Sequence, residues 1–160
     1  MKVLVVSDSH GFEGNLKKVV ERVSPIDMLI HLGDFESGEE RIKKLVNCEV
    51  HMVPGNNDYA PHLEKDKLLT LGKNHRVFLT HGHKYGVHYG PYGLYDKAKD
   101  NNCNVVLYGH THIPKISYIE NVTIVNPGSI SFPRQNYTQP TFLIIEIDKK
   151  NEIHFSIGNY

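Results

Sequence analysis

Short apolar runs alternate with amphipathic stretches through the first third of the chain. The runs at 2–6, 28–32 and 49–53 are bounded by Gly, Pro, Asn and Asp, a pattern typical of buried parallel strands. Between them, residues 13–23 and 38–46 place their apolar side chains on one helical face. This βαβαβ order predicts a parallel sheet with right-handed crossovers.

The rest of the chain is richer in strands. Residues 67–71 and 76–80 flank a turn at 72–74 and predict a hairpin. A helix is expected at about 93–101, and strands are expected at 104–108, 115–119, 122–125, 141–147 and 152–156. Parallel units followed by antiparallel hairpins predict an α/β fold of two packed mixed β-sheets flanked by helices, with residues 1–160 forming one domain.

Composition narrows the class of protein. The chain has 160 residues, with 18 Lys plus Arg against 18 Asp plus Glu, so no extended nucleic-acid surface is evident. Cys48 and Cys103 lie far apart and form no CxxC motif, which favours a reducing, intracellular setting over a disulfide framework. No apolar stretch reaches the roughly 20 residues of a membrane span. We therefore expect a soluble, cytoplasmic protein, with a homo-oligomer left open.

Seven side chains of the kinds that bind metals follow closely after apolar runs. They are Asp8, His10, Asp34, Asn56, His81, His110 and His112. In open α/β sheets, ligand sites lie beyond the carboxyl ends of the strands, so we expect all seven at one rim of the molecule.

The chemistry of this set favours two metal ions. Oxygen and imidazole ligands without thiolate are unlike a structural zinc site, so we expect Mn, with Ni, Co, Fe and Zn as alternatives. Seven ligands are too many for one catalytic ion that also holds water. Two ions that share a bridging carboxylate fit better, and such pairs are typical of phosphoryl displacement.

Five ordered motifs and a later one resemble a known family. They are Asp8-x-His10, Gly33-Asp34, Gly55-Asn56-Asn57-Asp58, His81-Gly82-His83, Gly109-His110-Thr111-His112 and Asn126-Pro127-Gly128-Ser129. Over nearly the whole chain this resembles the calcineurin-like metallophosphoesterases, in particular their small single-domain bacterial and archaeal phosphodiesterases. The resemblance implies a four-layer αββα sandwich.

The resemblance also implies residue roles. The first ion would be held by Asp8, His10, Asp34 and His112, and the second by Asn56, His81 and His110, with Asp34 as the bridge. A hydroxide shared by both ions would attack phosphorus in line in a small phosphodiester substrate. Two alternatives remain, a phosphomonoesterase and a non-catalytic scaffold on the same fold.

One position departs from the family pattern. Many members have His where this chain has Asn57, and that His helps to protonate the leaving group. An amide can donate a hydrogen bond but is no general acid near neutral pH. We therefore expect Asn57 to accompany weaker catalysis on esters with poor leaving groups.

Further residues have weaker signals. Asp58 is expected to fix its turn or orient a ligand, and His83 to support a ligand. Arg134 is a candidate contact for substrate phosphate, although a surface arginine is more common. His31, inside an apolar strand, is expected to be buried and hydrogen-bonded. The other histidines, His51, His62, His75, His88 and His154, are expected at the surface or in loops.

A group of tyrosines follows His81. Tyr85, Tyr89, Tyr92 and Tyr95 fit either a packed loop or an aromatic wall for substrate. The packed loop is slightly favoured.

Overall fold

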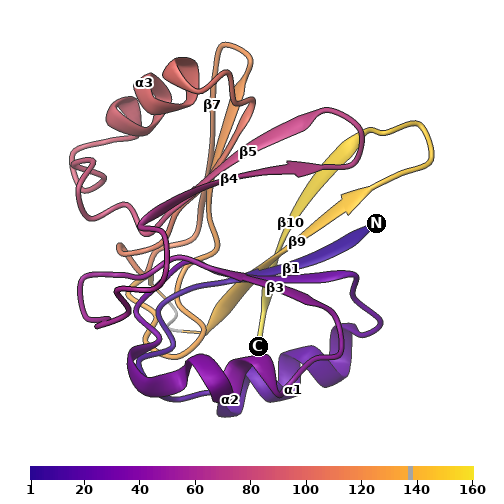
Figure 1. The fold of residues 1–160 in the computed structure, drawn as a ribbon, viewed down its shortest axis with the longest axis vertical. Helices are drawn as coiled ribbons and strands as arrows, with labels where there is room; N and C mark the ends of the chain where they lie inside the picture. Colours follow the sequence, from indigo (N-terminus) through magenta and orange to yellow (C-terminus); the bar gives the residue numbers. More distant parts are fainter. Residues whose placement is uncertain (137–138) are drawn as a thin grey trace.

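Two five-stranded β-sheets lie face to face in the computed structural model, which describes residues 1–136 and 139–160 (Figure 1). The first sheet has the order β10 (Ile153–Asn159), β9 (Thr141–Ile147), β1 (Lys2–Val6), β2 (Met28–His31) and β3 (Glu49–Met52). The second has the order β4 (Asp66–Leu71), β5 (His75–Thr80), β6 (Val105–Leu107), β8 (Val122–Asn126) and β7 (Lys115–Ile119).

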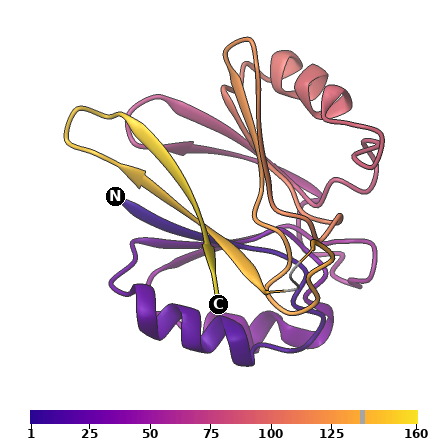
Figure 2. The same cartoon turned by 180° about the vertical axis from the view of Figure 1, so that it is seen from behind.

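Helices cover the outer faces of both sheets. The helical segments are α1 (Gly14–Val23), the short 3₁₀ turn η1 (Glu36–Gly38), α2 (Glu39–Lys43) and α3 (Tyr92–Asp100). Opposite views agree that α1 and α2 lie beneath the first sheet and that α3 lies against the second (Figures 1 and 2). The expected four-layer αββα sandwich is confirmed.

Alternation along β1 explains the layers. Val3 and Val5 face the second sheet and are fully buried, whereas Leu4 and Val6 face the helices and are equally buried. The buried side chains of α1, which are Leu16, Val19 and Val20, pack in the same cluster as Leu4 and Val6 on this outer face. Burial of each such side chain stabilises the fold by about 1.5–3 kcal/mol, so both faces of β1 hold the sandwich together.

Strand direction sets the place of the functional site. In the first sheet β1, β2 and β3 run parallel, and in the second β5, β6 and β8 run parallel. The loops that leave the carboxyl ends of β1, β2, β5 and β6 are joined by backbone hydrogen bonds, among them Asp8 N–H to the Gly33 carbonyl at 3.0 Å and Gly109 N–H to the His81 carbonyl at 3.1 Å. Both sheets therefore contribute loops to one rim.

Two expected elements differ in extent. The helix expected at 38–46 is confined to η1 and α2, although Leu45 and Val46 still pack on the core. The chain must reverse within five residues to enter β3 at Glu49, which ends the helix early. The strand expected at 152–156 continues to Asn159, because β10 pairs with β9 as far as Asn159 opposite Thr141.

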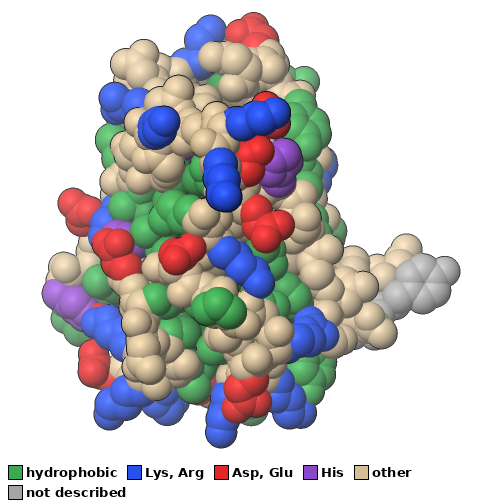
Figure 3. All heavy atoms as spheres, turned by 90° about the vertical axis from the view of Figure 1, so that its right-hand side faces the viewer, with side chains coloured by type: hydrophobic (Ala, Val, Ile, Leu, Met, Phe, Trp, Pro, Cys, Tyr) green, Lys and Arg blue, Asp and Glu red, His purple; other side chains and the backbone are tan. Residues whose placement is uncertain are grey.

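The far end of the molecule has a mixed surface. The face that bears the N-terminus and the β9–β10 turn shows acidic and basic side chains interspersed, unlike the continuous basic surface that nucleic acids bind (Figure 3). Both cysteines are free, as expected. Among the described residues, none of the helices is long and apolar enough to cross a membrane.

Candidate metal centre

The first ligand group joins Asp8, His10 and His112, whose ligand atoms all lie within 4.8 Å of one another. His112 Nε2 is 3.3 Å from Asp8 Oδ1, and the Nε2 atoms of His10 and His112 are 3.3 Å apart. The loop after β1 supplies Asp8 and His10, and the loop after β6 supplies His112. The two sheets thus build this group together.

The second ligand group joins Asp8, Asp34 and His81, within the same 4.8 Å limit. His81 Nε2 lies 3.4 Å from Asp34 Oδ2 and 3.9 Å from Asp8 Oδ1. Asp34 Oδ2 is also 3.8 Å from His10 Nε2 in the first group. Asp8 belongs to both groups and Asp34 reaches both, so the carboxylates lie between two sets of imidazoles.

An unusual backbone presents these side chains. Asp8, His10, Asp34, His110 and His112 all have positive φ, between 47° and 69°. Non-glycine residues rarely adopt this conformation, which costs on the order of 1–3 kcal/mol each and persists where the surrounding structure enforces it. Five such residues in three loops indicate a rim shaped for side-chain placement.

Backbone carbonyls orient two of the imidazoles. His81 Nδ1 lies 2.7 Å from the Leu32 carbonyl oxygen, and His112 Nδ1 lies 2.6 Å from that of Phe132. Carbonyl oxygens only accept, so each Nδ1 carries hydrogen and each Nε2 is turned toward the carboxylates. This is the arrangement by which proteins fix metal-binding histidines.

Two atoms at the centre have unmet bonding capacity. Asp8 Oδ1 and His81 Nε2 are buried and have no hydrogen-bond partner among the described residues. Unpartnered buried polar atoms are rare in native structures and point to an absent ion or water. A mixed carboxylate and imidazole set without thiolate fits a divalent transition metal, so these residues fit the ions that the sequence implies.

Charge at the centre is strongly coupled. Burial by itself raises the pKa of Asp34, but the His81 ring 3.4 Å away and the hydrogen bonds from Asn57 outweigh it and hold that pKa well below its ordinary value. Burial lowers the pKa of His81, yet the nearby carboxylates of Asp34 and Asp8 raise it overall. Asp34 therefore stays an anion that attracts cations.

His110 lies beside the second group. Its backbone N–H donates to Asp8 Oδ2 at 3.1 Å, and its ring centre is 5.1 Å from that of His81. Burial and the charges of His81 and His88 lower the pKa of His110 to about 4. A neutral ring is the form that ligates metal. The exposed His88 ring, 4.9 Å from His110, was expected only as a surface residue, and its sequence surroundings carry no signal of this contact.

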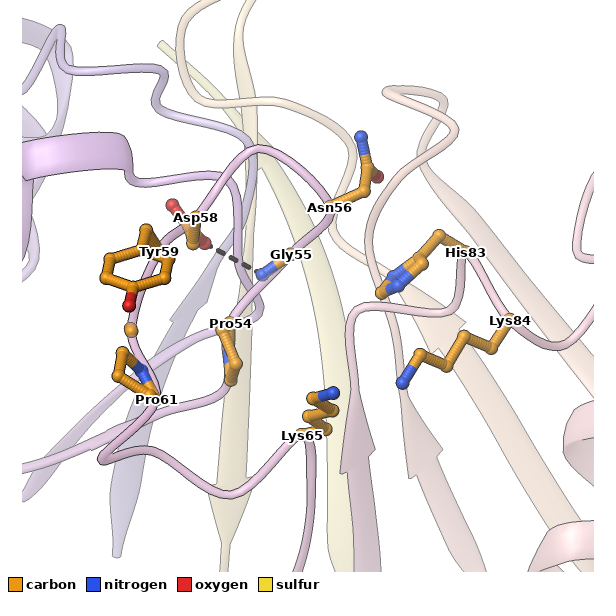
Figure 4. A pocket seen from close by; sticks show the side chains of 10 residues that line it. Pro54, Gly55, Asn56, Asp58, Tyr59, Pro61, Lys65, His83 and Lys84 are labelled. Carbon is orange, nitrogen blue, oxygen red and sulfur yellow. Dashed lines mark hydrogen bonds between the residues drawn. The ribbon is translucent and has the colours of Figure 1, made fainter.

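Asn56 and Asn57 differ in their surroundings. Asn56 is exposed, and its amide projects away from Gly55 (Figure 4). Asn57 binds Asp34 twice, through its N–H to Oδ1 at 2.9 Å and through Nδ2 to Oδ2 at 2.8 Å. Asp58 accepts the N–H groups of Asp34, Glu36 and Gly55, and thereby joins the loops after β2 and β3. Figure 4 shows its bond to Gly55.

Two glycines permit the close approach of these loops. A Cβ atom at Gly55 would overlap Asp34 Oδ1, and one at Gly109 would overlap Ser7 Oγ. Both glycines precede residues of the site. Each motif thus pairs a residue assigned to the site, Asn56 or His110, with a preceding glycine that leaves room for the neighbouring loop.

Pockets flank the centre on two sides. On one side, His10 and His112 border an open cavity of about 780 Å³ whose rim carries Phe12, Phe132 and the exposed Arg134. On the other, Asn56 and His83 border a pocket of about 390 Å³ that also contains Lys65 and Lys84 (Figure 4). His83 is half-buried, with its ring 5.4 Å from that of His81.

Several residues outside the centre have structural roles. His31 is fully buried, as expected; its Nδ1 accepts Gly33 N–H at 3.2 Å and its Nε2 lies 3.0 Å from Ser9 Oγ. His51 and His75, expected at the surface or in loops, are half-buried in strands, where the His75 ring bonds the Asn151 carbonyl at 2.8 Å. Short-range sequence could not show that contact, because its partner is 76 residues away.

The tyrosines form no wall at the centre. The Tyr85 hydroxyl donates to Asp66 at 2.6 Å, and Tyr85 and Tyr95 pack against the core beneath α3. Tyr89 and Tyr92 are largely exposed, and none of the four borders either flanking pocket. The packed-loop interpretation holds for Tyr85 and Tyr95. Glu36, 3.1 Å from His10 Nδ1, joins the site without any signal in the sequence.

Comparisons with known proteins identify the family. Residues 1–150 match the model of the calcineurin-like phosphoesterase superfamily domain. The chain is 36% identical over 140 residues to the probable metallophosphoesterase YsnB of Bacillus subtilis, covering 87% of this chain and 80% of that protein. It is 29% identical over 167 residues to a phosphodiesterase of Methanocaldococcus jannaschii, covering 94% and 95%.

Solved structures share the fold. A predicted phosphoesterase from Streptococcus pneumoniae superposes with a TM-score of 0.79 at 25% identity, covering 99% of this chain and 97% of that one. Vps29 from Entamoeba histolytica superposes with a TM-score of 0.80 at 20% identity, covering 100% and 99%, which shows the fold alone. The chain belongs to the calcineurin-like phosphoesterase superfamily and is a metal-dependent phosphoester hydrolase.

Proposed function

We propose that this hydrolase is a phosphodiesterase that works with two divalent ions, Mn²⁺ being the preferred metal. The observation that carries the proposal is the pair of overlapping ligand groups, which share Asp8 and both approach Asp34. We assign the first ion to Asp8, His10, Asp34 and His112, and the second to Asp34, Asn56, His81 and His110. When bound, the ions would supply a water of lowered pKa as nucleophile and offset negative charge on phosphate.

The chain's own residues hold this centre in place. Asn57 fixes the Asp34 carboxylate through two hydrogen bonds, and Asp58 clamps the loop that carries both asparagines. Glu36 Oε1 lies 3.1 Å from His10 Nδ1, accepts the hydrogen of that nitrogen and so orients the ring. Arg134, on the rim of the cavity beside His10 and His112, is a candidate contact for a phosphate oxygen.

A diester substrate is favoured over a monoester by two considerations. The relatives from Methanocaldococcus jannaschii and Escherichia coli are named phosphodiesterases. The centre is also flanked by pockets on two sides, and a diester has two substituents to place. We further infer that residues 1–160 act as one phosphoesterase domain in the cytoplasm.

The test is hydrolysis by metal-free protein to which Mn²⁺, Ni²⁺, Co²⁺ or Mg²⁺ is returned. Bis(p-nitrophenyl) phosphate represents a diester and p-nitrophenyl phosphate a monoester. We expect no turnover without metal, highest turnover with Mn²⁺, and a higher kcat/KM for the diester. A higher value for the monoester would make the protein a phosphomonoesterase.

The second candidate function is a scaffold. Its support is the fold shared with Vps29, which a structure from Chaetomium thermophilum shows in complex with a cyclic peptide. The described residues of this chain retain both ligand groups, which a scaffold does not need. Failure to bind any of the four metals, together with inactivity on both esters, would favour the scaffold.

A further inference from the structure

The pocket beside Asn56 gathers positive charge at the edge of the metal centre. Lys65 comes from the loop before β4 and Lys84 from the loop after β5, and both border this pocket with His83. In Figure 4 the Lys84 side chain extends across the pocket toward the side where Lys65 lies, and both ammonium groups lie below the His83 ring; both side chains are exposed. Two like charges that border one pocket repel each other, and an anion bound between them would offset that repulsion.

Neither lysine has a partner for its charge among the described residues. Some other lysines do, since Lys43 pairs with Glu39 at 2.7 Å, Lys97 with Asp100 at 3.6 Å, and Lys2 donates to the Val23 carbonyl at 2.6 Å, whereas exposed lysines such as Lys149 and Lys150 form no such contact among the described residues. What sets Lys65 and Lys84 apart is that they border the same pocket. Lys65 and Lys84 form neither an ion pair nor a side-chain hydrogen bond within residues 1–136 and 139–160.

The nearby carboxylates are already engaged. Both oxygens of Asp58, which borders the pocket, accept backbone N–H groups. Asp66, next to Lys65 in the chain, accepts the Tyr85 hydroxyl. The two ammonium groups exceed the single charge of Asp58, so the lining of the pocket has a net positive charge that suits an anion supplied from outside.

The size and lining of the pocket indicate what the anion is attached to. Its volume of about 390 Å³ falls within the range of about 300–1,000 Å³ typical of small-molecule sites. Pro54, Pro61 and the almost fully exposed Tyr59 ring form an apolar wall. The charge of a phosphate monoester, about −1.5 to −2 at neutral pH, is opposite in sign to the net charge of this lining.

We propose that this pocket binds a second phosphate group of the substrate, so that the diester cleaved at the metal centre also carries a phosphate monoester. The inference rests on the proposed function, because Asn56 is both a wall of the pocket and an assigned metal ligand. The apolar wall would contact the sugar-sized spacer that separates the two phosphates.

A matched pair of substrates tests the subsite. Thymidine 5′-(p-nitrophenyl phosphate) with and without a 3′-phosphate releases the same coloured product from the same scissile group. We expect the 3′-phosphate to raise kcat/KM about tenfold, mainly through KM, since a contact made equally in the ground state and the transition state lowers KM and leaves kcat unchanged. In the double variant Lys65→Gln/Lys84→Gln the ratio of the two kcat/KM values should fall to near one.

The control variant is Lys149→Gln/Lys150→Gln, in the β9–β10 turn at the opposite end of the sandwich, which should keep the wild-type ratio. A ratio near one in the wild type, or an undiminished ratio in the Lys65/Lys84 variant, would overturn the subsite. Preferential binding of inorganic phosphate that leaves the ratio at one would mean a site for free phosphate and would also overturn it.

A binding measurement separates failure of the subsite from failure of the proposed function. Metal-free protein is titrated with thymidine 3′-phosphate, or with thymidine as the control, while backbone amide shifts at 59–65 and 83–84 are followed by NMR. Saturable shifts with the phosphate that vanish in the Lys65/Lys84 variant support the subsite even if no ester is hydrolysed. Absence of saturable shifts in the wild type counts against it, whatever the enzyme hydrolyses.

Discussion

Asn57 donates two hydrogen bonds to Asp34, from its backbone N–H to Oδ1 at 2.9 Å and from its side-chain amide to Oδ2 at 2.8 Å. The residue that stands where many relatives have a proton donor is thus bonded to the carboxylate assigned as the bridge. Burial raises the pKa of Asp34, but these two bonds and the nearby His81 ring outweigh it and keep that pKa low. Asn57 therefore stabilises the Asp34 carboxylate and cannot protonate the leaving group.

Leaving-group dependence should reveal the missing proton donor. We expect the rate of the wild type to fall steeply as the pKa of the leaving group rises from nitrophenol to alkyl alcohols. Asn57→His should restore at least about tenfold on an alkyl ester, since general acid catalysis contributes about 10²–10⁴-fold. Asn57→Ala is the control, because it removes the side-chain bond to Asp34 without adding an acid. High turnover with a flat dependence in the wild type would contradict the prediction.

Asp34→Asn should abolish the activity by removing the negative charge between the two ligand groups. We expect kcat to fall at least about a hundredfold, comparable with the loss of a strong electrostatic contact in other enzymes. Metal content measured on the purified variant should fall below two ions per chain. Asp148→Asn, in the exposed Asp148–Glu152–His154 group, is the matched control and should keep wild-type values. Metal-dependent turnover retained in Asp34→Asn would remove Asp34 from the bridging position.

Chelation and return of metal should change stability as well as activity. Since the ligands approach one another only in the folded chain, metal at about 100 times its Kd should stabilise the fold by about 2.7 kcal/mol per independent site. Thermal unfolding of metal-free protein with and without Mn²⁺ measures this shift. An unchanged melting temperature at saturating Mn²⁺, Ni²⁺ and Co²⁺ would argue against a metal centre.

Gly109→Ala should damage both the fold and the site. The new methyl group would overlap Ser7 Oγ and come within 2.9 Å of Asp8 Oδ2. Overpacking of this kind costs about 1–3 kcal/mol, and displacement of Asp8 should weaken metal binding. Gly14→Ala is the comparison, because a Cβ there meets nothing within 4 Å. Urea unfolding and metal titration of both variants distinguish a local clash from a general effect of added methyl groups.

His31 should make stability depend on pH in mild acid. Burial lowers the pKa of His31 to about 4 in the folded state, against 6.5 as its ordinary value. Between these values the unfolded chain binds a proton that the folded chain does not, so the free energy of unfolding falls as pH falls from about 6.5 to about 4. The full loss is about 3 kcal/mol, at about 1.36 kcal/mol per unit of pKa.

Urea unfolding of metal-free wild type and His31→Gln across this range isolates the effect, because the other histidines titrate in both proteins. The wild type should lose more stability toward pH 4 than the variant. Parallel curves for the two proteins would mean that His31 is protonated in the folded state or exchanges with solvent.

The sequence by itself determined the order of strands and helices, the two-sheet fold and the end of the molecule where the site lies. Runs such as Val3–Val6 are apolar on both faces, which is possible only between two covering layers, and Asp8, Asp34, His81 and His110 follow the ends of parallel strands. Periodicity is a local property that a chain displays without folding, and the alternation of strands and helices implies parallel strands through the right-handed crossover rule.

Only the tertiary structure decided which side chains meet. In the folded chain Asn57 hydrogen-bonds Asp34, and the His88 ring lies beside His110. Glu36 contacts His10, and Lys65 and Lys84 border the same pocket. These contacts join loops that are distant in the chain, and they depend on the registration of two sheets and on the positive φ angles at the rim. Sequence spacing gives each loop its chemistry, but the packing of the sandwich sets the distances between loops.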